Sequence, residues 1–220
     1  MKAMRKEAGF TLVEIAIVLV IIGLLLGGIL KGQEMITQAK IKNVIADMSG
    51  VSAAMYGYQD RYRALPGDDN KADRWSGATK GGGDGVINGK WTASSGEAIH
   101  FWDHLRRAGF VSGSGAENPF NAVSGKMGVQ TGNGDTPVAG ILSDGAAAPA
   151  TPTLFSGLLL CSGNLPDKIA ISVDAQMDDG LGKSGSVRAD KQSGNPADIA
   201  TAASAYSEDG VSTYTVCRQM

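Results

Sequence analysis

The most conspicuous pattern in the chain is an apolar run of 21 residues from Phe10 to Leu30, in which Glu14 is the only charged side chain. A helix rises 1.5 Å per residue, so this run would reach roughly 30 Å, the thickness of the hydrocarbon core of a bilayer. The uninterrupted run argues against the core helix of a soluble protein, which normally keeps a polar face. The pattern therefore predicts a membrane-spanning helix.

After Lys31 the apolar residues are separated by steps of three and four, which is the spacing of one helix face. The residues of this stripe are Ile41, Val44, Met48, Val51, Met55, Tyr58 and Tyr62. Pro66 and Gly67 then end the pattern, so we predict a single helix of about 50 residues that stops before them. We expect the stripe to pack on the chain's own domain, and a coiled-coil partner helix is the alternative.

The remainder, residues 64–220, is rich in glycine and in turn signals. Alternating patterns predict strands at Lys168–Ala175 and Val211–Cys217, and a short helix is expected at Glu97–Gly109 with Gly109 as its C-cap. The fold class predicted is α+β, with a long N-terminal helix packed on a small antiparallel β-sheet that carries long loops.

The segment before the apolar run carries three basic residues and one acidic residue. By the positive-inside rule this end stays cytoplasmic and the chain after Leu30 is exported. A secretory signal peptide would have a shorter apolar region with its small-residue cleavage site after it, whereas here Gly9 precedes the run. A plain membrane anchor does not explain Glu14, because a carboxylate in an apolar span is costly and marks a functional position by default.

The segment Gly9–Glu14, with the sequence GFTLVE, resembles the processing site of type IV pilins and type II secretion pseudopilins. The resemblance covers residues 5–30. It implies that prepilin peptidase cuts between Gly9 and Phe10 and methylates the new amino group of Phe10. It also implies a pilin-like division of the chain into a leader (residues 1–9), a transmembrane and assembly half of the helix (10–30), an amphipathic half (31–63) and a periplasmic domain (64–220).

Cleavage would expose a positively charged amino group on Phe10, and Glu14 of a neighbouring subunit is its natural partner within an apolar filament core. Burying either charge alone would cost several kcal/mol, so the pair would set the axial register of assembly more than it would add stability.

Cys161 and Cys217 are the only cysteines, which fits a single disulfide in an oxidising compartment if the domain is exported. Two free buried thiols are the alternative. The pair also resembles the C-terminal disulfide-bounded region of many type IV pilins.

No spacing typical of an enzyme is found. Serines lack the Gly-x-Ser-x-Gly elbow, and a net charge of −2 with no basic stripe gives no nucleic-acid footprint. His100 and His104 stand four residues apart and could ligate a metal, but Phe101 occupies the position at which a metalloprotease has glutamate. We expect them to lie on a surface helix face, and we predict neither an enzyme nor a nucleic-acid partner.

Two groups of acidic residues suggest calcium, which prefers oxygen ligands and is bound by some pseudopilins. One group is Asp174, Asp178 and Asp179, and the other is Asp68, Asp69, Asp73 and Asp84. Solvated turns capped by aspartate explain the same residues without an ion. No firm metal site is predicted, and the first group is favoured if calcium binds.

The resemblance thus predicts a structural subunit that assembles into a type IV pilus, as a minor pilin. The alternatives are a pseudopilin of the type II secretion system and, from another class, a membrane-tethered periplasmic binding module. Expected partners are prepilin peptidase, other pilin or pseudopilin subunits and the inner membrane. The C-terminal domain would lie in the periplasm before assembly, and the subunit in a pilus or pseudopilus afterwards.

Overall fold

The computed structural model describes residues 10–135, 137–146, 151–195 and 197–220. The chain divides into two compact units, Met1–Ala39 and Lys40–Met220. Helix α1, Leu12–Tyr62, contributes residues to both units. Gly9, one residue of the predicted cleavage junction, lies outside the described residues.

In the first unit the described structure is the N-terminal part of α1 and the two residues before it. The large apolar side chains from Phe10 to Leu30 are all substantially exposed, from 46% at Ile22 to 87% at Leu12. Within the described residues, α1 is the helix that is long and apolar enough to cross a membrane. A contiguous exposed apolar surface of this kind marks a place of contact with a membrane or with other protein chains.

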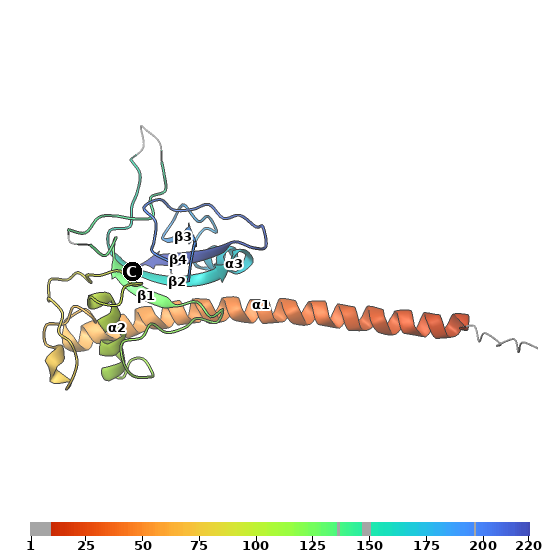
Figure 1. Cartoon of the computed structure of the whole chain (residues 1–220), viewed down its shortest axis with the longest axis horizontal. Coiled ribbons are helices and arrows are strands. Elements are labelled where there is room, and N and C mark those ends of the chain that lie inside the picture. The colour runs from red at the N-terminus through yellow and green to blue at the C-terminus, as the bar shows by residue number, and fades with distance from the viewer. Residues whose placement is uncertain (1–9, 136, 147–150, 196) are drawn as a thin grey trace, which may run out of the picture. The chain divides into compact units, whose positions relative to one another are not determined.

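The second unit contains the end of α1 and all other elements (Figure 1). These are the 3-10 helix η1 (Ala72–Arg74), α2 (Glu97–Arg107), β1 (Met127–Thr131), β2 (Leu158–Pro166), α3 (Asp167–Met177), β3 (Val187–Lys191) and β4 (Thr213–Gln219). The four strands form one antiparallel sheet in the order β1-β2-β4-β3. The predicted α+β layout, a long N-terminal helix with a small antiparallel sheet, is confirmed.

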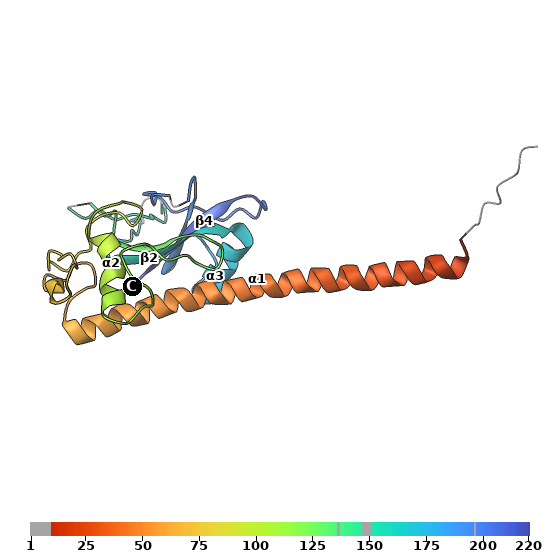
Figure 2. The same cartoon turned by 60° about the horizontal axis from the view of Figure 1, so that its bottom comes forward.

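The main core of the second unit forms around the amphipathic stripe of α1. The stripe residues from Ile41 to Tyr58 are buried, as their spacing predicts. They share one apolar cluster with side chains of α2, α3 and the sheet, among them Trp102, Val173 and Leu160. Figure 2 shows α2 crossing this segment of α1, with the sheet beside both helices. Each large apolar side chain buried here contributes about 1.5–3 kcal/mol of transfer free energy.

A second, smaller core lies on the opposite face of the sheet. Successive strand residues point to opposite faces, so Leu160 joins the main core while Leu159 and Cys161 join the second. Trp91 and Phe155, from the loops before β1 and β2, cover this side. The sheet is therefore buried on both faces, by helices on one and by loops on the other.

The strand predicted at Lys168–Ala175 is wrong, because this segment is helix α3. The prediction rested on alternating isoleucine and valine, but the buried apolar residues are Ile169, Ala170 and Val173, which share one helix face. So short an apolar segment fits both periods, and contact with the sheet decides between them. The strand predicted at Val211–Cys217 exists as β4, although it begins at Thr213 and leaves Val211 exposed.

The short helix expected at Glu97–Gly109 is present as α2. It ends as predicted, with Gly109 in the left-handed region at φ 80°. The amide of Phe110 then donates to the carbonyl of Leu105 at 3.0 Å, which closes a Schellman-type cap.

Candidate functional site

The start of α1 is organised by a reciprocal pair of side chains, Thr11 and Glu14. The amide and the hydroxyl of Thr11 both donate to Glu14 Oε2 at 2.8 Å, and the amide of Glu14 donates to Thr11 Oγ1 at 3.3 Å. This is a capping box, which satisfies amides that have no partner within the helix. Both side chains and the neighbouring Phe10 are exposed.

The capping box gives Glu14 a role within its own subunit that the sequence interpretation missed. The spacing Thr-x-x-Glu at residues 11–14, just before an apolar run, is the signal that would have revealed it. The Thr11 bonds converge on Oε2, and a carboxylate has a second oxygen with which to accept from another group. Glu14 can therefore cap α1 and still face a cation from outside the subunit.

The two cysteines form a disulfide between the central strands of the sheet. Cys161 of β2 and Cys217 of β4 stand opposite each other in register, with their Cα atoms 4.0 Å apart. Both are completely buried in the second core. The bond thus links segments 56 residues apart in the chain.

His104 is buried, and the expectation that both histidines lie on a surface helix face is wrong for it. Its Nδ1 accepts from the amide of Gly67 at 2.9 Å, and its Nε2 lies 2.8 Å from the carbonyl oxygen of Thr79, to which it donates. Burial lowers the pKa of His104 below its usual value, and the bond to Thr79 opposes this only in part. With both ring nitrogens engaged, His104 joins the loop after α1 to α2.

A second buried polar group ties the same loop to α1. Asp69 accepts from the hydroxyl of Tyr58 at 2.6 Å and from Arg74 Nη1 at 2.6 Å. Burial alone would raise the pKa of Asp69, but the bonds from Arg74 and Tyr58 outweigh it and hold the pKa below its usual value. The sequence showed the turn at Pro66 but gave no sign of these partners, which come together only in the folded chain.

The carboxylates of Asp174, Asp178 and Asp179 lie together, each offering an oxygen within 4.8 Å of the others. They are also engaged by the segment between α3 and β3 and by the loop after β3. Asp178 Oδ2 accepts from the amide of Ser186 at 2.6 Å, and Asp174 Oδ2 accepts from the hydroxyl of Tyr206 at 2.7 Å. A calcium ion would have to share these oxygens with the bonds that already engage them.

The structure does not bring all four members of the second acidic group together. Asp68 and Asp84 lie with Glu97, while Asp69 and Asp73 form ion pairs with Arg74 and Lys80. The buried Asp68 carboxylate accepts the amides of Gly83 and Gly85 at 2.5 and 2.7 Å. These bonds fold the glycine-rich segment back onto the turn after α1, which is what a capping aspartate does.

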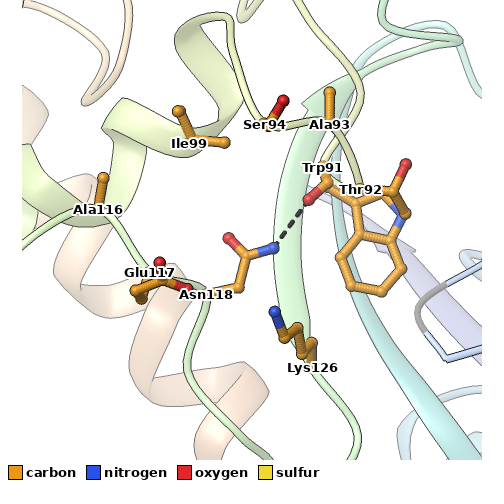
Figure 3. Close-up of a pocket in the computed structure, with 9 residues that line it drawn as sticks. All are labelled: Trp91, Thr92, Ala93, Ser94, Ile99, Ala116, Glu117, Asn118 and Lys126. Carbon is orange, nitrogen blue, oxygen red and sulfur yellow. Dashed lines mark hydrogen bonds between the residues drawn. The ribbon is translucent and has the colours of Figure 1, made fainter.

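A hollow of about 290 Å³ lies between the loop at Trp91, α2 and the segment before β1. Figure 3 shows Asn118 reaching across it, where its amide donates to the carbonyl of Trp91 at 2.8 Å. Lys126 and Glu117 supply charges at its wall, and its lining contains neither histidine nor cysteine.

Comparison with known proteins bears on the N-terminal segment. Residues 4–30 match the family model described as the prokaryotic N-terminal methylation motif. No curated protein matches the chain. The motif implies processing by prepilin peptidase and assembly with other pilin subunits, and it suggests a structural subunit rather than an enzyme. The apolar helix is consistent with an anchor in the inner membrane. Together the motif and the exposed helix behind it indicate that the chain is the precursor of a type IV pilin-like or pseudopilin subunit.

Proposed function

We propose that the chain is a structural subunit of a type IV pilus, working as a minor pilin. Prepilin peptidase removes residues 1–9 by cutting between Gly9 and Phe10, and it methylates the amino group of Phe10. Before assembly the subunit is anchored in the inner membrane with residues 64–220 in the periplasm. It then enters the pilus through its N-terminal helix.

The observation that carries this proposal is the apolar helix surface that starts at the motif. From Phe10 to Leu30 no large apolar side chain is buried within the subunit. Lipid can cover this surface before assembly, and the same surface of other subunits can cover it afterwards. A single-span anchor needs only the first of these environments, and the methylation motif at residues 4–30 supports a subunit that uses both.

Glu14 supports the proposal through the geometry of its cap. The carboxylate lies one turn from the amino group that cleavage would create on Phe10, and Thr11 fixes its position. In an apolar filament core, the charged amino group of one subunit requires a carboxylate from the next. Glu14 is the only acidic side chain in the apolar run that can supply it.

The disulfide favours a pilin over a pseudopilin, because it resembles the C-terminal disulfide-bounded region of many type IV pilins. The mature chain of 211 residues (220 minus 9) is longer than a typical major pilin, which favours a minor one. The pseudopilin remains the second candidate, since the motif is common to both. Deleting the gene separates them: the proposal requires loss of surface filaments with secretion intact, and the alternative requires the reverse.

The direct test is mass spectrometry of the protein extracted from membranes. We expect a mature chain that begins with N-methylated Phe10, and an intact Met1 or a cut after Leu30 would overturn the proposal. The Glu14→Ala variant, prepared in parallel, should be cleaved as the wild type is but should fail to enter filaments. Normal filaments from Glu14→Ala would show that the charge pair does not set the register.

A further inference from the structure

The hollow beside Trp91 has walls that are fixed by bonds within the second unit. The amide of Trp91 donates to Gln130 Oε1 at 3.1 Å, which ties this wall to β1. The amide of Gly163 donates to the carbonyl of Lys126 at 3.0 Å, which fixes the wall before β1. Asn118 joins the two walls through its bond to the carbonyl of Trp91. The hollow is therefore part of the folded sheet and its supports.

Lys126 brings a positive charge into this hollow. Its side chain lines the hollow and the residue is half-buried. Figure 3 shows its ammonium end directed toward Asn118. In the part of the chain that the structure describes, neither a hydrogen bond nor an ion pair engages this ammonium group. Because a charge withdrawn from water is costly unless it is paired, the position favours a carboxylate from outside the chain.

Oxygen acceptors lie beside this cation. The amide nitrogen of Asn118 donates to Trp91, and its Oδ1, which Figure 3 shows facing the hollow, accepts no bond from the described residues. Glu117 adds an exposed carboxylate that is likewise outside any hydrogen bond or ion pair of the described chain. It acts at longer range on Arg106, whose pKa is lowered by burial and raised by Asp103 and Glu117. An amide oxygen and a carboxylate together suit an ammonium group.

The remaining lining leaves room for a small apolar group. Ile99 of α2, with Ala93 and Ala116 from the loops on either side, contributes short apolar side chains. The volume of about 290 Å³ lies just below the roughly 300–1,000 Å³ of sites for drug-sized ligands, so the ligand must be smaller. A molecule that combines a carboxylate, an ammonium group and a short apolar part is an α-amino acid.

We propose that this hollow binds a free α-amino acid with a short apolar side chain. Its carboxylate pairs with Lys126, and its ammonium group meets Asn118 Oδ1 and Glu117. The C-terminus of a peptide shares the carboxylate but has no ammonium group beside it, so the role of Glu117 distinguishes the two sources. All lining residues belong to the second unit, so the inference does not depend on assembly through the N-terminal helix.

The test is titration calorimetry of the full-length chain in detergent with L-valine as the probe. The wild type should bind L-valine saturably. Lys126→Met and Glu117→Gln remove a charge but keep the length of the side chain, and each should raise the Kd about tenfold. Lys183→Met and Glu208→Gln are the matched controls and should leave the Kd unchanged, since both residues are exposed and lie outside the lining.

A second probe and a third variant separate the remaining outcomes. N-acetyl-L-valine keeps the carboxylate and loses the ammonium group, so it should bind about tenfold more weakly than L-valine. Equal binding of the two probes would overturn a free amino acid as the ligand. Ala116→Phe fills the hollow and should abolish binding while the disulfide and the circular dichroism spectrum stay as in the wild type. No saturable binding of L-valine, or an unchanged Kd in Lys126→Met, would overturn the site itself.

Discussion

His104 shows how much of the second unit depends on one neutral side chain. Its ring lies in the core, accepts from Gly67 and donates to Thr79, so only one tautomer of the uncharged imidazole fits. A protonated ring would turn the acceptor at Nδ1 into a second donor facing the amide of Gly67. The loop after α1 is therefore held to α2 only while His104 is neutral.

We predict from this that the second unit loses stability as the pH falls through the range just below 6.5. The pKa of His104 is lowered in the folded state, mainly by burial, with Asp69 and Asp103 opposing and His100 adding to the shift. The pKa of this histidine in the unfolded chain is near 6.5. Below that pH the unfolded chain binds a proton that the folded chain does not bind, so the free energy of unfolding decreases by up to about 1.4 kcal/mol per pH unit. The contribution is fully present above that value.

Urea unfolding of the full chain in detergent between pH 7.5 and 5.5 measures this slope. His104→Gln should be less stable at neutral pH but should show a flatter profile. His100→Gln is the matched control and should change the slope much less than His104→Gln does, because His100 makes the smallest contribution to the lowered pKa of His104. An unchanged slope in His104→Gln would contradict the assignment.

The elements of the second unit differ in how far their own residues specify them. The apolar stripe of α1 and the C-terminal cap of α2 can be predicted from the sequence, because each depends on residues three to five positions apart in the chain. Helix α3 was misread because eight residues of alternating small and branched side chains fit either period. The capping box at Thr11 is local and could have been predicted, whereas the burial of His104 depends on Gly67 and Thr79, which are distant in the sequence.

At the level of the sheet, we predict that the disulfide is the main covalent source of stability. Cys161 and Cys217 join the two central strands, and in the chain-entropy model a closed loop of 56 residues stabilises the fold by about 4 kcal/mol. The double variant Cys161→Ala and Cys217→Ala should lower the free energy of unfolding by roughly 2–4 kcal/mol. Denaturant titration with and without reductant measures this, and reductant should affect the wild type but not the variant. A reductant effect that persists in the variant would rule the disulfide out as its cause.

At the scale of the whole molecule, we predict that the second unit alone and the full chain differ in solubility. Residues 40–220 contain both apolar cores, whereas the described residues before them expose their apolar surface. A chain that begins at Lys40 should therefore be soluble without detergent, monomeric and cooperatively folded, while the full chain should require detergent. Gel filtration and circular dichroism test this. Aggregation of the shortened chain with the disulfide formed would show that the second unit needs the first.

The sequence by itself determined the character of the N-terminal segment, because the apolar run, the basic residues before it and the motif from Gly9 to Glu14 depend on near neighbours in the chain. It also determined where α1 turns amphipathic, since burial follows the helical period. Only the tertiary structure decided which strands pair, that Cys161 meets Cys217 in register, and that His104 is buried between Gly67 and Thr79. These features join residues tens of positions apart, so they exist only once the chain has closed around its two cores.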